Sequence, residues 1–482
     1  MGKGDLTLRK GNPFMKIAVF QDSAGFIEPE CINAFQRLDH IVKVIRLERD
    51  SSNPDVTLPY NIVERVSELL SFMPDLLFMV NGNGIDNMGL IPKIAALLKI
   101  PLALWYVDRP YTLENWNTGY VSPTTIMFLT DKLYMQDLRD SGLKKSFYLP
   151  LATNPARFSE GIVQYKDRLM DIVFVGKLDR DKAYTYFNIL KDRWNNKPDN
   201  FDEIFRKIIN TYRNRPGLSI ALISESTFSD HGFPLRFPST EIKTLFYNSA
   251  EYMANVLHRT ETIKALKPFN ITVCGGWEWL DVVDKRHYLN EVNYFSGLAS
   301  IYKNAIINLN ISRLQLMTAL NQRLFDVPAA GGFLITDYRE DVEELFDTGR
   351  EIVCYRNIEE LKSNIRYFQS HPEERRKIAE SAKEKVMEKH TYEIRMSEMF
   401  KYVSLCLTDS EYSEQMNRLI RTDHSYVDAL NLLGAAAYQI KQNGLSEEFF
   451  KLGLSLDPFN TDGKKGLEVI NRILGKRRFA TA

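Results

Sequence analysis

Polar side chains with the chemistry to hold an anion gather in residues 306–355. They follow a predicted strand at 305–309 or lie on the short predicted helix after it: Asn310, Ser312, Asn321, Arg323 and Asp326. The Arg323 guanidinium can form bidentate, charge-assisted hydrogen bonds with phosphate oxygens. The Asp326 carboxylate can accept hydrogen bonds from the vicinal hydroxyls of a ribose. The alternative is an ordinary surface ion pair, because residues three apart share one helix face.

Two glycines, Gly331 and Gly332, connect this helix to the next predicted strand at 332–336. Glycine allows a positive φ and a close approach of the backbone to a ligand. The start of a helix also offers free N–H groups and a partial positive charge, which suit a phosphate. The segment therefore predicts a pocket for a diphosphate and a ribose, with both glycines contributing to it.

Short apolar runs alternate with helical patterns through the chain. The first series of predicted strands is 16–20, 42–47, 75–80, 102–107, 125–129 and 147–149, and the second is 171–175, 219–223, 271–274, 305–309, 332–336 and 352–355. Strands that alternate with helices indicate parallel sheets with helices on both faces. Ligands of such sheets bind beyond the carboxyl ends of the strands. We therefore expect an α/β protein with two Rossmann-like, doubly wound domains that face a cleft.

The expected domains are an N-terminal domain at 14–160, a second domain at 165–390, a crossover helix at 391–408 and a helical tail at 410–482. Small residues at helical spacing and a proline at the end of the second helix make the tail resemble one tetratricopeptide repeat. A plain helical hairpin is the alternative. One repeat cannot bury its own face, so the tail is expected to pack on the body or on a protein partner.

The composition excludes several classes of protein. Lys and Arg total 62, as do Asp and Glu, so the chain lacks the net positive charge of a general nucleic-acid binder. The four cysteines form no CxxC pair, which favours buried thiols in a reducing compartment over a zinc site. The sequence shows no signal peptide and no apolar run long enough for a transmembrane helix. A cytoplasmic location is expected.

Motifs in the second half resemble those of a known family. They are a strand ending N-L-N, an N-x-R-x-F-D helix, A-A-G-G, T-D-Y, E-L-F-x-x-G-x-E-I and a closing H-T-Y-x-x-R at 390–395. Residues 171–400 resemble the glycosyl transferases group 1 domain of the CgeB-like (spore-maturation) family. The resemblance implies a GT-B fold and sugar transfer from a nucleotide diphosphate sugar, usually without metal.

The resemblance extends to three further places. The F-V-G turn at 174–176, with Arg180 after it, corresponds to the turn whose backbone faces the donor phosphates, so Gly176 is a predicted donor contact. Trp277 follows a Gly-Gly turn in the region where the nucleobase docks. Lys177 and Arg180 are expected to help Arg323 stabilise the charge of the leaving nucleoside diphosphate. The W-x-x-D-x-P motif at 105–110 places Asp108 at the carboxyl end of a strand.

One departure bears on mechanism. Retaining enzymes of the related glycogen-synthase-like superfamily carry two glutamates separated by seven residues; Asp326 aligns with the second, and the first falls on Thr318. A threonine does not ionise at neutral pH. An inverting reaction instead needs a base from the N-terminal domain, and Asp108 is the candidate, with Asp22 as the weaker one. The alternative role for Asp108 is a structural aspartate in the turn before Pro110.

The function expected from the sequence is transfer of a sugar from a nucleotide diphosphate sugar to a hydroxyl of a protein or surface glycan. No cofactor is expected, and because no suitable D-x-D motif follows a strand, no metal either. The alternatives are a sugar-nucleotide epimerase of the same fold and a catalytically inactive binding or scaffold protein built around the tail. A nicotinamide-dependent dehydrogenase is disfavoured because no G-x-G-x-x-G follows the first strand.

Overall fold

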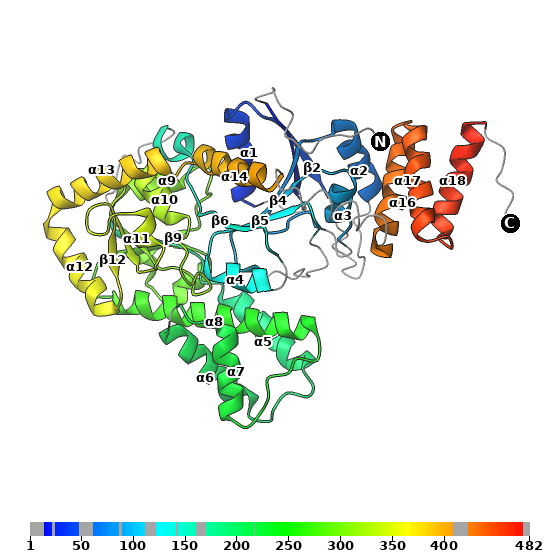
Figure 1. Cartoon of the computed structure of the whole chain (residues 1–482). Helices are drawn as coiled ribbons and strands as arrows, with labels where there is room; N and C mark the ends of the chain where they lie inside the picture. The colour runs from blue at the N-terminus through cyan, green and yellow to red at the C-terminus, as the bar shows by residue number, and fades with distance from the viewer. Residues whose placement is uncertain are drawn as a thin grey trace.

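The computed structural model describes residues 14–21, 25–47, 61–85, 89–110, 122–140, 143–160, 170–215, 217–407 and 423–475. Within these residues two parallel six-stranded β-sheets lie next to each other, with helices packed around them (Figure 1). A helical insertion projects from one side of the molecule, and the C-terminal helices lie at the far end of the N-terminal half.

The N-terminal sheet has the strand order β2-β1-β3-β4-β5-β6. Its strands are β1 (Lys16–Gln21), β2 (Ile41–Arg46), β3 (Leu76–Val80), β4 (Leu102–Tyr106), β5 (Thr125–Leu129) and β6 (Ser146–Tyr148). Its helices are α1 (Ile27–Arg37), α2 (Ile62–Phe72), α3 (Leu90–Leu97) and α4 (Leu133–Asp140). Every residue of β3, β4 and β5 is buried, as expected for parallel strands covered on both faces.

The C-terminal sheet has the strand order β12-β11-β10-β7-β8-β9. Its strands are β7 (Met170–Val175), β8 (Ile271–Gly275), β9 (Tyr288–Asn290), β10 (Ala305–Asn310), β11 (Leu334–Asp337) and β12 (Val353–Tyr355). Counted from β7, this is the dinucleotide-binding order 3-2-1-4-5-6, which reverses between β7 and β10. The N-terminal sheet reverses between β1 and β3. Ligands are therefore expected beyond these two strand pairs.

A four-helix insertion separates β7 from β8: α5 (Arg180–Arg193), α6 (Phe201–Asn214), α7 (Ile220–Asp230) and α8 (Thr240–Ala265). Its core is aromatic, with Trp194 and Phe246 in edge-to-face contact at 5.9 Å between ring centroids. In Figure 1 the insertion is the green group of helices, and α8 runs back from it toward the two sheets.

The strand predicted at 219–223 is wrong, because these residues begin α7. The Ser219 side chain accepts a hydrogen bond from the Ala221 N–H at 3.3 Å and caps the helix. Ile220, Ile223 and Phe228 are buried at helical spacing, whereas Leu222 is exposed. A short apolar run does not by itself distinguish a strand from a buried helix segment.

The chain returns to the N-terminal half after the second sheet. Around the C-terminal sheet lie α9 (Leu298–Asn304), α10 (Arg323–Ala329), α11 (Val342–Leu345), α12 (Ile358–Ser370) and α13 (Pro372–Lys389). Next, Thr153 pairs with Thr391 in a parallel bridge, and α14 (Tyr392–Leu407) packs against α1 and β5. Two parallel doubly wound sheets with this return crossing make up a GT-B fold.

The described residues from 423 to 475 contain the helices α16 (Val427–Gln439), α17 (Asn443–Leu456) and α18 (Thr461–Ile473). Helix α16 packs on α2 and α3, and the Ser67 hydroxyl lies 2.9 Å from Gln439 Oε1 (Figure 1). The tail thus packs on helices of the N-terminal half, which is one of the two arrangements expected for it. Its likeness to a tetratricopeptide repeat and the predicted domain limits stay predictions. No described helix combines the length and apolar character that crossing a membrane requires.

Candidate functional site

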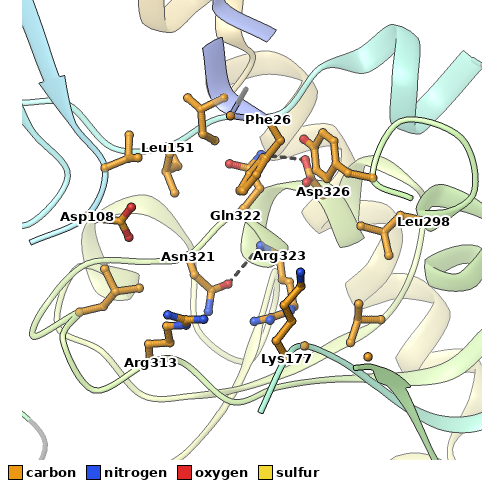
Figure 2. Close-up of a pocket in the computed structure, with 18 of the residues that line it drawn as sticks. Phe26, Asp108, Leu151, Lys177, Leu298, Arg313, Asn321, Gln322, Arg323 and Asp326 are labelled. Carbon is orange, nitrogen blue, oxygen red and sulfur yellow. Dashed lines mark hydrogen bonds between the residues drawn. The ribbon is translucent and has the colours of Figure 1, made fainter. Parts of the chain in front are cut away.

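A cavity of about 530 Å³ lies between the two sheets (Figure 2). Loops that follow β1, β3 and β4 line one side, and loops that follow β7, β8, β9 and β10 line the other, together with the start of α10. These are carboxyl ends of parallel strands and include both points where the strand order reverses. The cavity therefore lies where the topology predicts a ligand.

Four basic side chains reach this cavity from the C-terminal half: Lys177, Arg259, Arg313 and Arg323. Arg259 donates hydrogen bonds to the carbonyls of Lys177 at 2.6 Å and Ile311 at 3.1 Å. Arg323 donates to Asn310 Oδ1 at 2.7 Å. Arg313 forms an ion pair with Asp179, and Lys177 forms one with Glu291 at 2.8 Å.

The positive charge of this cluster is only partly balanced. Among the described residues, the hydrogen-bond acceptors of Arg259 and Arg323 are uncharged carbonyl and amide oxygens. Burial lowers the pKa of Arg259 well below its usual value, and the nearby Arg313 and Arg323 lower it further. Burial likewise lowers the pKa of Arg323. Guanidiniums stay charged at neutral pH, so the lowered pKa values mark a place where a bound anion would relieve repulsion.

Two predicted donor contacts, Asn310 and Ser312, lie behind the cavity rather than on its surface. Asn310 Oδ1 accepts hydrogen bonds from Arg323 and, at 2.9 Å, from Asn321 Nδ2. Asn310 Nδ2 lies 3.1 Å from Ser312 Oγ, and the Ser312 N–H donates to Asp337 Oδ1 at 2.9 Å. These buried residues fix Asn321 and Arg323, which do line the cavity (Figure 2).

Asp326 also lines the cavity but is only 1% exposed. Its Oδ1 accepts hydrogen bonds from Thr153 Oγ1 at 2.7 Å and Gln322 Nε2 at 3.0 Å. Its Oδ2 has no hydrogen-bond partner among the described residues. Burial raises the pKa of Asp326 to about 8, so the carboxyl carries a proton at neutral pH. A group of this kind can donate to, or accept from, a ligand hydroxyl.

Asp108 lies on the N-terminal side of the cavity, at the end of β4. Asn81, which has a left-handed φ of 52°, donates to Asp108 Oδ2 at 2.8 Å and accepts from the Val107 N–H at 2.9 Å. Figure 2 shows the Asp108 carboxylate and the side chains of Arg313 and Asn321 around the same space. The weaker candidate base, Asp22, lies outside the described residues.

Four further predicted donor contacts, besides Asn310 and Ser312, do not line the cavity. Arg180 pairs with Asp281 at 2.6 Å and lies beside Trp277, whose side chain is 60% exposed. Gly331, with φ of 78°, follows the C-terminus of α10. A Cβ on Gly332 would lie 2.6 Å from the Tyr302 carbonyl, so this glycine serves close packing. By contrast, Gly176 lines the cavity, and a Cβ there would lie 3.0 Å from Arg323 Nη2.

Thr318, where a catalytic acid would stand in the retaining superfamily, does not line the cavity. It is buried, and its hydroxyl donates to Asp131 Oδ1 at 3.0 Å. Asp131 Oδ2 also accepts from the N–H groups of Met317 and Thr318. Thr318 therefore belongs to a contact between the two halves of the chain.

Sequence reasoning missed Arg259, Arg313 and the buried Glu28, all of which line the cavity. Arg259 lies in α8, a charged helix whose sequence resembles a solvated surface helix. Arg313 lies three residues beyond β10, one of the two strands between which the strand order reverses. Its place just after such a strand was the sequence signal that could have identified it. Glu28 accepts a hydrogen bond from Asn83, and no motif indicated it.

No curated protein matches this chain. Similar solved structures include a glycosyltransferase from Rickettsia africae (11% identity, 83% of this chain and all of that one, TM-score 0.44). A second is Anabaena HepE in complex with UDP (11% identity, 81% of this chain and 100% of that one, TM-score 0.44). A third is sucrose-phosphate synthase from Thermosynechococcus elongatus (11% identity, 82% of this chain and 100% of that one, TM-score 0.41). At these values the likeness says nothing about substrates of this chain.

A protein-family model described as glycosyl transferase-like matches residues 241–401. The matched segment includes α8, β10 and α10, and hence Arg259, Arg313 and Arg323. The narrower resemblance to the CgeB-like type stays a prediction. The match confirms the enzyme class predicted from the sequence, a glycosyltransferase.

Proposed function

We propose that this enzyme transfers a sugar from a nucleoside diphosphate sugar to a hydroxyl group of a protein or surface glycan, without a bound metal ion. The observation that carries the proposal is the set of converging guanidiniums at the switch point of the C-terminal sheet. Arg259, Arg313 and Arg323 provide the charge and hydrogen-bond donors that a diphosphate needs. The nearby carboxyl of Asp326 would contact a ribose hydroxyl.

The diphosphate is the leaving group of the reaction, and it gains negative charge as its bond to the sugar breaks. Guanidiniums fixed before the reaction stabilise that charge without reorganising, in a site where water is partly excluded. The network of Asn310, Ser312 and Asn321 holds Arg323 in this way. Metal-dependent transferases assign the same task to a cation, and here the arginines would perform it.

In the proposed transfer step, Asp108 takes the proton of the acceptor hydroxyl. The hydroxyl oxygen bonds to the anomeric carbon while the bond from that carbon to the diphosphate oxygen breaks. The electron pair of the broken bond leaves with the nucleoside diphosphate. Attack from the N-terminal side, opposite the leaving group, inverts the anomeric configuration. The position of Thr318 outside the cavity supports a route that does not use an acid there.

A panel of UDP-, GDP-, ADP- and dTDP-sugars tests the proposal by thermal shift. A true donor at 100 times its dissociation constant should stabilise the fold by about 2.7 kcal/mol. Release of nucleoside diphosphate from that donor should then survive excess EDTA. A strict requirement for Mg²⁺ or Mn²⁺ would contradict metal independence.

Two further outcomes concern the alternatives. A changed sugar on the intact donor nucleotide, formed without an acceptor, would indicate an epimerase. Binding without any donor turnover or hydrolysis would indicate a binding protein and overturn the proposed activity.

A further inference from the structure

Among the buried polar residues of helix α8 are Glu251, Asn255 and Arg259, which lie on one face. They are four residues apart, so one lies above the next along the helix. Their exposed fractions are 3%, 5% and 3%. Burial of such groups is unfavourable unless each finds a partner, so this face of α8 must meet polar groups of other elements.

Together these three residues contact three loops near the cavity, those after β7, β10 and β4. Arg259 donates to the carbonyl of Lys177, after β7, and to that of Ile311, after β10. Asn255 Oδ1 accepts from the Leu314 N–H at 2.8 Å. Glu251 forms a buried ion pair with Arg109, the residue after Asp108. A single helix therefore contacts the proposed diphosphate site and the loop that carries the proposed base.

Arg109 is held firmly in this position. Its guanidinium lies 5.8 Å from the ring centroid of Tyr134 and 5.7 Å from that of Tyr247. Tyr134 belongs to the N-terminal half, and Tyr247 belongs to α8. Burial by itself lowers the pKa of Arg109, but the Glu251 carboxylate outweighs it and the pKa is raised, so Arg109 stays charged.

Arg109 and Asp108 are neighbours in the chain but differ in the exposure of their side chains. Arg109 is 5% exposed and points into the packed contact with α8, whereas Asp108 is exposed at the cavity. Asn81, which follows β3 of the N-terminal sheet, donates a hydrogen bond to the Asp108 carboxylate. The Arg109–Glu251 pair adds the link to the C-terminal half, which carries the donor contacts.

We infer that Arg109 and Glu251 are positioning residues for the transfer step: their ion pair fixes the Asp108 loop relative to α8, whose Arg259 faces the donor diphosphate. The inference rests on the proposed function. A base must lie within hydrogen-bond reach of the proton it takes, and a shift of about 1 Å can cost roughly a hundredfold in rate. The pair sets that distance across the two halves of the chain.

The test separates donor binding from turnover. The double variant Arg109→Met/Glu251→Met removes both charges, so no unpaired charge is left buried. We expect its affinity for the nucleoside diphosphates UDP, GDP, ADP and dTDP to stay within about threefold of wild type. The rate of nucleoside diphosphate release at saturating donor should fall by about 10- to 100-fold. The single variant Arg109→Lys keeps the positive charge. Its rate of nucleoside diphosphate release should lie between the rates of the double variant and the wild type.

A matched control is Arg213→Met. Arg213 of α6 forms an ion pair with Glu261 of α8, and neither residue lines the cavity. It should leave both affinity and rate unchanged. A double variant that turns over at the wild-type rate would overturn the inference. If that variant does not fold, the same comparison with Glu251→Gln decides. Failure of the proposed function looks different, because the wild-type protein would then bind or turn over no nucleotide sugar.

Discussion

Replacing Arg259 with methionine separates the cost to ligand binding from the cost to folding. In the free protein, the change removes two hydrogen bonds to the carbonyls of Lys177 and Ile311. Leaving a carbonyl without its donor costs about 1–3 kcal/mol for each of the two, but loss of repulsion from Arg313 and Arg323 offsets part of this cost. Methionine also refills much of the aliphatic volume. The variant should therefore fold, with a free energy of unfolding lowered by about 1–3 kcal/mol.

The loss in nucleotide binding is a separate quantity, because it is measured on the folded protein. A charged hydrogen bond to a phosphate contributes about 1.5–3 kcal/mol, which corresponds to a roughly 10- to 150-fold weaker dissociation constant. The loss should shrink as salt is raised, because part of the attraction is electrostatic.

Calorimetric titration with the nucleoside diphosphate of the best donor measures this directly. Arg180→Met is the control, since Arg180 is an arginine of the same half that pairs with Asp281 outside the cavity. Its affinity should match wild type. If Arg259→Met binds as tightly as wild type, the arginine cluster is not the diphosphate site and the reasoning fails.

Two more substitutions test the cavity. Asp108→Asn keeps the shape and the contact with Asn81 but removes the base, so turnover should fall about 100- to 10,000-fold with donor affinity unchanged; normal turnover would show that another group takes the proton. Asp326 has a pKa raised by burial to about 8, against roughly 3.9 when unfolded. The folded state therefore holds a proton that the unfolded state releases, and stability falls as pH rises through that window. Asp326→Asn should reduce the fall in melting temperature between pH 5 and pH 8, and an equal fall in both proteins would contradict the assignment.

The sheets were largely predictable because their strands are buried on both faces. Runs such as LLFMV in β3 and TIMFL in β5 are apolar at every position, and this marks central parallel strands. Strand β9 was missed because YLN is short and only partly buried. Residues 219–223 were wrongly predicted as a strand because they form a short apolar run. They begin helix α7, which Ser219 caps and whose buried residues have helical spacing.

The candidate site was predictable where its residues are close in sequence. Asn321 lies just before α10, and Arg323 and Asp326 lie in its first turn, so their spacing in the sequence places them together. Arg259 was not predictable, because a buried polar face and a solvated face have the same sequence pattern until the packing partner is known. The two glycines after α10, Gly331 and Gly332, do not line the cavity, and their predicted donor contacts have a structural alternative. A residue that allows close approach to a ligand equally allows a helix to end or two segments to pack.

Thr318 has a structural role, which explains why position 318 holds no acidic residue. The backbone N–H groups of Met317 and Thr318 are capped by Asp131, a residue of the N-terminal half that follows β5. That segment thus ties the halves together on the same side of the molecule as Arg109 and Glu251. A carboxylate at position 318 would be buried against Asp131 and repelled by it. In the proposed inverting reaction, the proton acceptor comes from the N-terminal loops that face the cavity. Asp108 is the one fixed both to its own sheet, through Asn81, and next to a residue bound to α8.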